Sequence, residues 1–176
     1  MRICIDPGHG GKDAGSVGKI NKQSIKEKNI TLNIALLLEQ YLLVFGHKIY
    51  LTRRCDRSLS LQARSKYANR YKVNLFISIH CNSAYTPKAE GIETWIHPYS
   101  TVAKRYAKPV QKSLIKAFPK HKNRGIKEAN FHVLRETKMA AILIETEFIN
   151  NPRMAKFLAN EKNQEKIASA IASGIN

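Results

Sequence analysis

One segment, residues 75–83, constrains the fold of this chain more than any other. It reads Leu-Phe-Ile-Ser-Ile-His-Cys-Asn-Ser, an apolar run of strand length that leads into His80. Side chains alternate between the two faces of a strand, and here both faces are largely apolar. Such a run, bounded by polar residues, predicts a central strand of a sheet that is covered on both sides.

Two other segments have the same form. Residues 2–9 (Arg-Ile-Cys-Ile-Asp-Pro-Gly-His) run from a short apolar strand into a glycine turn that carries His9, and residues 140–145 (Ala-Ala-Ile-Leu-Ile-Glu) form an apolar strand that ends on Glu145. In open α/β sheets, ligands bind outside the carboxyl ends of the strands. If the three strands are parallel neighbours, His9, His80 and Glu145 meet at one edge of the sheet.

The remaining sequence predicts helices between further strands. Helices are predicted at 28–45, 56–69, within 101–127, from 151 and at 163–175, and strands at 47–52, 73–80, 91–97, 131–134 and 139–148. Pro109 should kink or divide the helix in which it lies, and residues 7–26, rich in Gly and Lys, predict a long site loop. We therefore predict an α/β fold: a single domain, 1–176, with a mostly parallel twisted sheet of about six strands and helices on both faces.

Positive charge is the strongest signal in the composition. Thirty Lys and Arg against thirteen Asp and Glu give a net charge of +17, which steers polyanions toward the protein. Residues 101–127 contain nine Lys or Arg and no acid, which fits either a solvated helix face or a polyanion-binding surface. Nucleic acid and an acidic wall polymer both fit this charge. Nucleic acid is the weaker alternative, because aromatic residues do not interleave with the basic run and no helix-turn-helix, zinc-finger or RNA-binding signature occurs.

The cysteines and the N-terminus limit the class of protein further. Cys4, Cys55 and Cys81 form no C-x-x-C pair, so free thiols are expected, with Cys81 a buried thiol rather than a metal ligand. No apolar run approaches the ~20 residues of a membrane span. The N-terminus enters a strand directly and lacks the pattern of a signal peptide, which predicts synthesis in the cytoplasm without one.

Two histidines at strand ends with a carboxylate nearby match the His₂Glu ligand set of a catalytic zinc ion. A hydrolytic zinc site needs a further carboxylate to take a proton from water and pass it to the leaving group. The spacing leaves the third ligand open among the acidic residues Asp6, Asp13, Glu27, Glu90 and Glu93, and it leaves the base open between Glu145 and Glu147, which would share a face of a regular strand. No H-E-x-x-H motif occurs.

The ordered set of motifs resembles the zinc-dependent N-acetylmuramoyl-L-alanine amidases, the family of bacterial autolysins and phage endolysins. The matching segments cover nearly the whole chain: I-D-P-G-H-G-G-K-D-A-G at 5–15, E-K-N-I at 27–30, L-T-R at 51–53, L-Q-A-R at 61–64, F-I-S-I-H-C-N-S at 76–83, R-G-I-K at 124–127, F-H-V-L-R at 131–135 and I-L-I-E at 142–145.

The resemblance implies a role for each site residue. His9, Glu27 and His80 would hold one zinc ion, and Glu145 would be the catalytic carboxylate. The implied reaction is hydrolysis of the amide between N-acetylmuramic acid and L-alanine of the peptidoglycan stem peptide. A zinc peptidase that acts on a different amide, or a nucleic-acid-binding module, are the alternatives. The chain departs from the family at Thr146-Glu147, and a second carboxylate there would raise the pKa of Glu145 if both lay in one pocket.

The resemblance also implies partners and a place of action. Peptidoglycan is the expected substrate, with anionic wall polymers at the basic surface 101–127, and the chain is expected to be monomeric, without a wall-binding module. It would reach the cell wall through a separate pore or as a fragment of a secreted protein. Three supporting residues have expected roles: Arg64 anchors a carboxylate or carbonyl, Asp6 orients a histidine or caps the turn, and His132 packs or is partly exposed rather than lining the site.

Overall fold

A six-stranded sheet forms the centre of the computed structural model, which describes residues 1–176. Its strands follow the order β4 (Lys48–Leu51), β1 (Arg2–Pro7), β5 (Leu75–Asn82), β8 (Ala140–Phe148), β6 (Ile92–Ile96) and β7 (Asn123–Glu128). The first four strands are parallel, β6 runs antiparallel to β8, and β7 is parallel to β6. The predicted mostly parallel sheet is confirmed.

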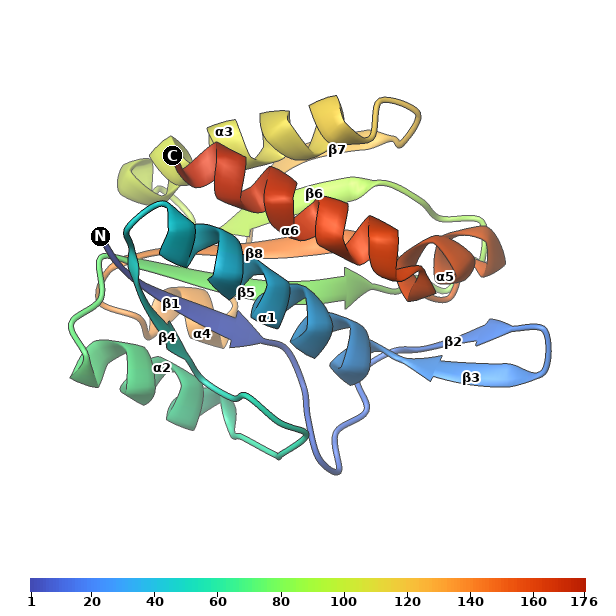
Figure 1. Cartoon of the computed structure of the whole chain (residues 1–176), viewed down its shortest axis with the longest axis horizontal. Helices are drawn as coiled ribbons and strands as arrows, with labels where there is room; N and C mark the ends of the chain where they lie inside the picture. Colours follow the sequence, from blue (N-terminus) through green and yellow to red (C-terminus); the bar gives the residue numbers. More distant parts are fainter.

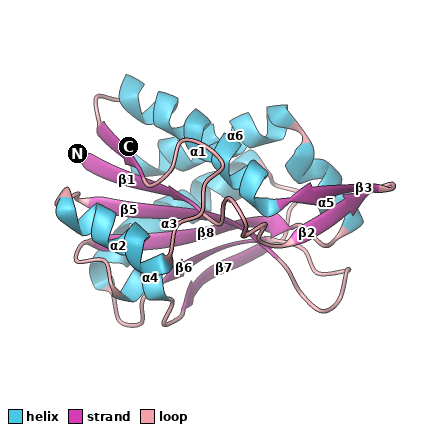
Figure 2. Cartoon of the chain, turned by 90° about the horizontal axis from the view of Figure 1, so that it is seen from below, coloured by secondary structure: helices cyan, strands magenta, loops and turns pink.

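Helices cover both faces of this sheet. The helices α1 (Glu27–Val44), α3 (Thr101–Ala117) and α6 (Glu161–Ile175) lie on one face, and α5 (Pro152–Ala159) leads into α6. The helices α2 (Leu61–Arg70) and α4 (His132–Arg135) lie on the opposite face, as Figures 1 and 2 show. None of the helices combines the length and the apolarity that crossing a membrane requires.

The side chains on the two faces of the sheet pack into two separate hydrophobic cores. Alternate residues such as Ile3, Ile77 and Ile142 are fully buried in the larger core under α1, α3 and α6. Their neighbours Phe76 and Leu143 belong to a smaller core under α2 and α4. Because burial on both faces requires apolar side chains at consecutive positions, this packing explains why the central strands are continuous apolar runs.

Four local predictions were wrong. Residues 131–134 lie at helix α4 rather than in a strand, and strand β7 overlaps the end of the segment 101–127, where no strand was predicted. The long loop contains the hairpin β2 (Val17–Ile20) and β3 (Gln23–Lys26), which projects beyond the sheet (Figure 1). Helix α2 begins at Leu61 rather than at 56, because Ser60 caps it by accepting from the backbone N–H of Ala63 at 3.1 Å. Pro109 lies within α3 and does not divide it.

The order of the strands places the predicted site residues together. Strand β5 lies between β1 and β8, with Pro7 opposite Ile79 and His80 opposite Glu145. The carboxyl ends of all three strands therefore share one edge of the sheet. This is the arrangement that the sequence predicted for His9, His80 and Glu145.

Candidate active site

The turn after β1 holds His9 in an unusual backbone conformation. His9 has a φ of 62°, in the left-handed region that residues with side chains seldom adopt. The turn is fixed by its surroundings: the Arg64 guanidinium donates to the carbonyl of His9 at 2.7 Å, and the N–H of Gly8 donates to the carbonyl of Ile79 at 3.0 Å. Strain of this kind persists where the surrounding structure imposes it, and it is common at functional sites.

Glu27 is the first residue of α1, and its carboxylate is almost fully buried. Its Oε2 accepts from the backbone N–H of Ser16 at 2.8 Å, and its Oε1 accepts from the backbone N–H of Cys81 at 2.8 Å. Its place at the helix N-terminus favours the negative charge. The start of α1, the loop before the hairpin and the central strand β5 therefore fix this carboxylate in place.

His9, Glu27 and His80 converge on one point. Glu27 Oε1 lies 3.2 Å from His9 Nε2 and 3.0 Å from His80 Nδ1. One ligand atom from each of the three residues lies within 4.8 Å of the other two. Two imidazole nitrogens and a carboxylate oxygen at this spacing match the donor set of a catalytic zinc site. Among the five acidic candidates for third ligand, Glu27 is the one in the cluster.

The electrostatics of the cluster favour a positive charge at its centre. Burial lowers the pKa of His9, but the hydrogen bond and the charge of Glu27 outweigh it and raise this pKa to about 9. Burial also opposes ionisation of Glu27, but His80 and His9 together hold the pKa of that carboxyl well below its usual range. A divalent cation would supply the positive charge that the carboxylate and imidazole donors attract.

Asp13 contacts the ring nitrogen of His9 that points away from Glu27. Its Oδ2 lies 2.8 Å from His9 Nδ1, and its Oδ1 accepts from the backbone N–H of Gly15 at 3.0 Å. A carboxylate on the outer nitrogen of a metal-ligating histidine fixes the ring orientation and its tautomer. Asp13 was one of the candidate third ligands, and its position is instead that of an orienting partner for His9.

Glu145 faces the cluster from β8, directly opposite His80 in the ladder. Its Oε2 is buried and has no hydrogen-bond partner, which is uncommon for a buried carboxylate. Burial raises the pKa of Glu145 to about 7; the charges of Glu27 and Glu93 act in the same direction, against those of His80 and His9. A carboxyl group with this pKa exchanges protons readily near neutral pH.

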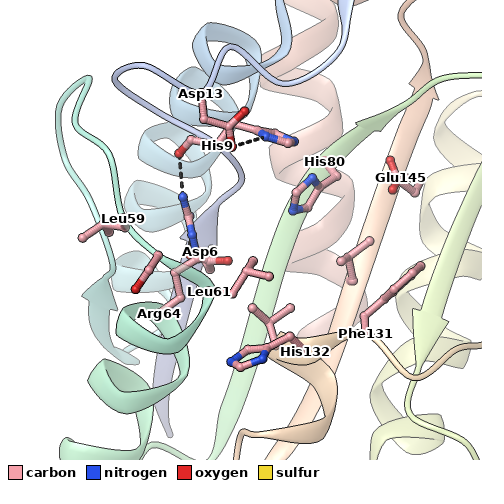
Figure 3. A pocket seen from close by; sticks show the side chains of 13 residues that line it. Asp6, His9, Asp13, Leu59, Leu61, Arg64, His80, Phe131, His132 and Glu145 are labelled. Atoms are coloured by element: carbon pink, nitrogen blue, oxygen red, sulfur yellow. Dashed lines mark hydrogen bonds and ion pairs between the residues drawn. The ribbon is translucent and has the colours of Figure 1, made fainter.

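These residues line a pocket of about 520 Å³ on the α2 and α4 side of the sheet. Figure 3 shows His9, His80 and Glu145 along one side of it, with Leu61, Phe131 and His132 across from them. The pocket therefore combines a polar side that carries the reactive groups with a partly apolar side. This combination is typical of small-molecule and peptide sites in enzymes.

Two buried arginines hold the floor of the site. Arg64 pairs with Asp6 at 2.8 Å and also donates to the carbonyl of Pro7 at 2.7 Å, which confirms its predicted role as an anchor. Arg53 donates to the carbonyls of Pro7, Gly8, Cys55 and Lys28. Asp6 binds Arg64 together with the hydroxyls of Thr52 and Ser78, so it neither orients a histidine nor caps the turn.

Glu147 does not share the pocket of Glu145. The pairing of β5 with β8 shifts register after His80, and a bulge of this kind turns the following side chains out of strict alternation. Glu147 is instead fully buried against His121, whose Nδ1 lies 2.8 Å from its Oε1. Glu147 would raise the pKa of Glu145 only if the two residues shared a pocket, and they do not; the acidic neighbours that raise this pKa are Glu27 and Glu93.

The other acidic candidates lie in separate ion pairs, and one further histidine, His132, lines the pocket. Glu90 pairs with Arg153, and Glu93 pairs with Arg124 and Lys127. The predicted partial exposure of His132 is confirmed, but its side chain also lines the pocket, which was not expected, and its buried Nε2 has no partner. The F-H-V-L-R motif was the available signal for it, but it was interpreted as a strand, which would not have fixed the direction of this side chain.

The fold and the site define an enzyme of the α/β class, with a candidate metal centre beside a buried carboxylate. A family model described as N-acetylmuramoyl-L-alanine amidase matches residues 3–176, and the chain belongs to this family. Family membership supports the amidase interpretation over the nucleic-acid-binding and peptidase alternatives. The resemblance found in the motifs is thereby confirmed.

Individual relatives agree with this assignment. The sporulation-specific N-acetylmuramoyl-L-alanine amidase of Bacillus subtilis is 36% identical over 99% of this chain and 67% of its own length. The endolysin of Bacillus phage SPP1 is 34% identical over 98% of this chain and 64% of its own. Among solved structures, the catalytic domain of the amidase CwlV from Bacillus (Paenibacillus) polymyxa var. colistinus matches with a TM-score of 0.92 and 37% identity, over 99% of this chain and 95% of that one.

Proposed function

We propose that this protein is a zinc-dependent peptidoglycan hydrolase that cleaves the amide between the lactyl group of N-acetylmuramic acid and L-alanine of the stem peptide. The observation that carries the proposal is the arrangement of His9, Glu27 and His80 as a ligand-type cluster, with the unpartnered Oε2 of Glu145 in the same pocket. The substrate follows from membership of the amidase family.

His9, Glu27 and His80 fit zinc by the chemistry of their donors, and they would leave a fourth position for water or substrate. A zinc ion bound there supplies a Lewis acid that polarises the scissile carbonyl and lowers the pKa of water to roughly 7. Glu27 provides the negative charge of the ligand set, and Asp13 keeps the ring of His9 in place through its 2.8 Å contact.

Glu145 is the proton carrier in this scheme. Its Oε2 accepts a proton as water attacks the carbonyl carbon, and it then delivers that proton to the alanine nitrogen as the C–N bond breaks. A pKa of about 7 suits both steps, because the group must be ionised before attack and protonated before departure of the amine. Burial of Oε2 limits the access of bulk water to the proton that it carries.

The rest of the proposal concerns the chain as a whole. Residues 1–176 act as one catalytic domain on the bacterial cell wall, and they act as a monomer. The lysines of α3 lie on the opposite face of the sheet from the pocket, and they would contact anionic wall polymers without blocking the site. Those lysines are exposed and make no ion pairs: Lys104, Lys108, Lys112 and Lys116.

Digestion of purified peptidoglycan tests this function. The protein is assayed as prepared, after chelation and after zinc is restored, with two readouts: new amino groups identified as N-terminal alanine, and new reducing sugar ends. We expect alanine amino groups that disappear on chelation and return with zinc, and no reducing ends. New amino groups on other residues would indicate a peptidase, and no products from several wall types would refute the proposed activity.

A further inference from the structure

A second charged cluster lies on the same sheet face as Glu145, one strand further along. At its centre is Glu93 on β6, whose side chain is only 2% exposed. Glu93 Oε2 accepts from Arg124 Nε at 2.5 Å and from Lys127 Nζ at 2.7 Å. Its Oε1 accepts from Asn82 Nδ2 at 2.8 Å and from Trp95 Nε1 at 3.0 Å. Both oxygens of this carboxylate are therefore fully used.

Arg124 and Lys127 keep positive charge and hydrogen-bond donors that Glu93 does not occupy. Arg124 and Lys127 carry one positive charge each against the single negative charge of Glu93, and neither forms an ion pair with another acid. A guanidinium has five N–H donors and an ammonium three, and each cation gives the protein side chains one hydrogen bond, both to Glu93. Their side chains remain 28% and 31% exposed. The cluster thus presents a surplus of positive charge and several free donors.

The backbone and the aromatic residues hold these cations in place. A Cβ at Gly91 would lie 2.7 Å from Cγ of Arg124, so the glycine makes room for the stem of that arginine. The guanidinium carbon lies 4.9 Å from the ring centroid of Phe148, and Lys127 Nζ lies 5.1 Å from that of Trp95. Contacts of this type favour a cation over a ring face, so both charges are positioned before any ligand arrives.

The cluster adjoins the active-site pocket. Glu93 is directly opposite Glu145 in the antiparallel ladder of β6 and β8, and opposed residues of such a pair have Cβ atoms about 5 Å apart on one face. The ring of Trp95 lies 5.3 Å from that of Phe131, which lines the pocket. Phe131 therefore links the pocket, which Glu145 also lines, to Trp95, and Lys127 lies over the ring of Trp95.

We propose that Arg124 and Lys127 form a carboxylate-binding subsite for the residue that follows L-alanine in the stem peptide. The inference rests on the proposed amidase function. Neighbouring strands lie about 4.8 Å apart, and an extended peptide advances about 3.5 Å per residue. If a peptide cleaved beside Glu145 on β8 ran toward β6, the group on its next residue would approach these cations, because both contact Glu93 on β6. Guanidinium and ammonium groups with free donors recognise a carboxylate by charge-assisted hydrogen bonds.

Two substrates and three variants test the subsite. The first substrate is N-acetylmuramoyl-L-alanyl-D-glutamic acid, which has a free α-carboxyl. The second is the same compound with that α-carboxyl converted to an amide. The variants are Lys127→Gln, Arg124→Gln and the control Lys162→Gln, an exposed lysine at the start of α6 without an ion pair. The readout is the ratio of kcat/KM for the acid to kcat/KM for the amide, measured on the zinc-loaded protein.

We expect the wild type and Lys162→Gln to prefer the acid about 10-fold, the value of one hydrogen bond to a charged group. Lys127→Gln and Arg124→Gln should each reduce this ratio to about threefold or less. A purely structural ion cluster would lower both rates together and leave the ratio unchanged. Equal cleavage of both substrates by the wild type would overturn the subsite and leave the amidase function standing, whereas no cleavage of either would refute the amidase function and the inference with it.

Discussion

Replacing Arg64 with methionine should destabilise the fold more than any loss of a surface charge. The Arg64 side chain is 4% exposed, and it pairs with the 1% exposed Asp6 at 2.8 Å. It also donates to the carbonyls of Pro7 and His9, each at 2.7 Å. Methionine keeps much of the apolar stem but leaves the Asp6 carboxylate with only the hydroxyls of Thr52 and Ser78 as donors.

The size of the effect follows from this geometry. Removing one partner of a buried ion pair costs about 3–5 kcal/mol, because the other charge stays buried without compensation. With a urea m-value of about 1–3 kcal/mol/M, the midpoint of unfolding should fall by at least about 1 M. The double variant Asp6→Asn/Arg64→Met should recover at least about 1 kcal/mol of this free energy of unfolding, because it removes the unpaired buried charge of Asp6.

Urea unfolding at pH 7 in the presence of a chelator measures these free energies without a contribution from metal. The control is Arg135→Met, which breaks the exposed pair of Arg135 with Glu136 and should cost less than about 1 kcal/mol. A loss below about 1 kcal/mol for Arg64→Met, or a double variant no more stable than the single one, would refute the reasoning. The single variant should also bind zinc more weakly, because Arg64 holds the carbonyl of His9.

Three further predictions concern pH, sterics and salt. In the metal-free protein, the raised pKa of Glu145, about 7, contributes stability that is present below pH 4.5 and is lost as the pH rises through 7. The free energy of unfolding of Glu145→Gln should therefore rise by on the order of 3 kcal/mol relative to that of the wild type across this pH window. A difference between the two free energies that stays constant with pH in urea unfolding would contradict this. In Gly8→Ala, the new Cβ would lie 2.6 Å from His80 Nε2, so the affinity for zinc should fall at least about 10-fold. Gly46→Ala, with open space around its Cβ, should bind zinc as tightly as the wild type. Equal affinities of the two variants in a zinc titration would count against the assigned ligands. Binding to whole cell walls should weaken as salt rises toward 1 M, and salt-independent sedimentation with the walls would remove the α3 lysines from the account.

The sequence predicted the centre of the fold because burial on both faces leaves an unmistakable pattern. The strands that carry His80 and Glu145 are apolar at consecutive positions, and the turn after the first strand is marked by Pro7 and glycines. These local signals also fixed which end of each strand meets the site. Glu27 could be singled out only through the family resemblance, since a glutamate at the start of a helix is common for dipole reasons alone.

The errors arose where tertiary contacts override local preference. Asp56 looks like a helix start, but its carboxylate binds the N–H of Gly11 at 2.7 Å and Lys28 Nζ at 2.6 Å, and the helix begins only after Ser60. Strand β7 has a polar sequence because it is the edge of the sheet. The separation of Glu147 from Glu145 depends on a bulge, which strand alternation does not reveal.

The central claim is that His9, Glu27 and His80 hold the zinc ion while Glu145 moves the proton. The most direct test measures zinc content and amidase turnover on the same sample of Glu145→Gln, beside the wild type. The account predicts about one zinc ion per chain in both proteins, as a catalytic site with three protein ligands requires, and no detectable turnover in the variant. Turnover at the wild-type rate in Glu145→Gln, or loss of its zinc, would contradict the separate roles assigned to the carboxylate and the ligand cluster.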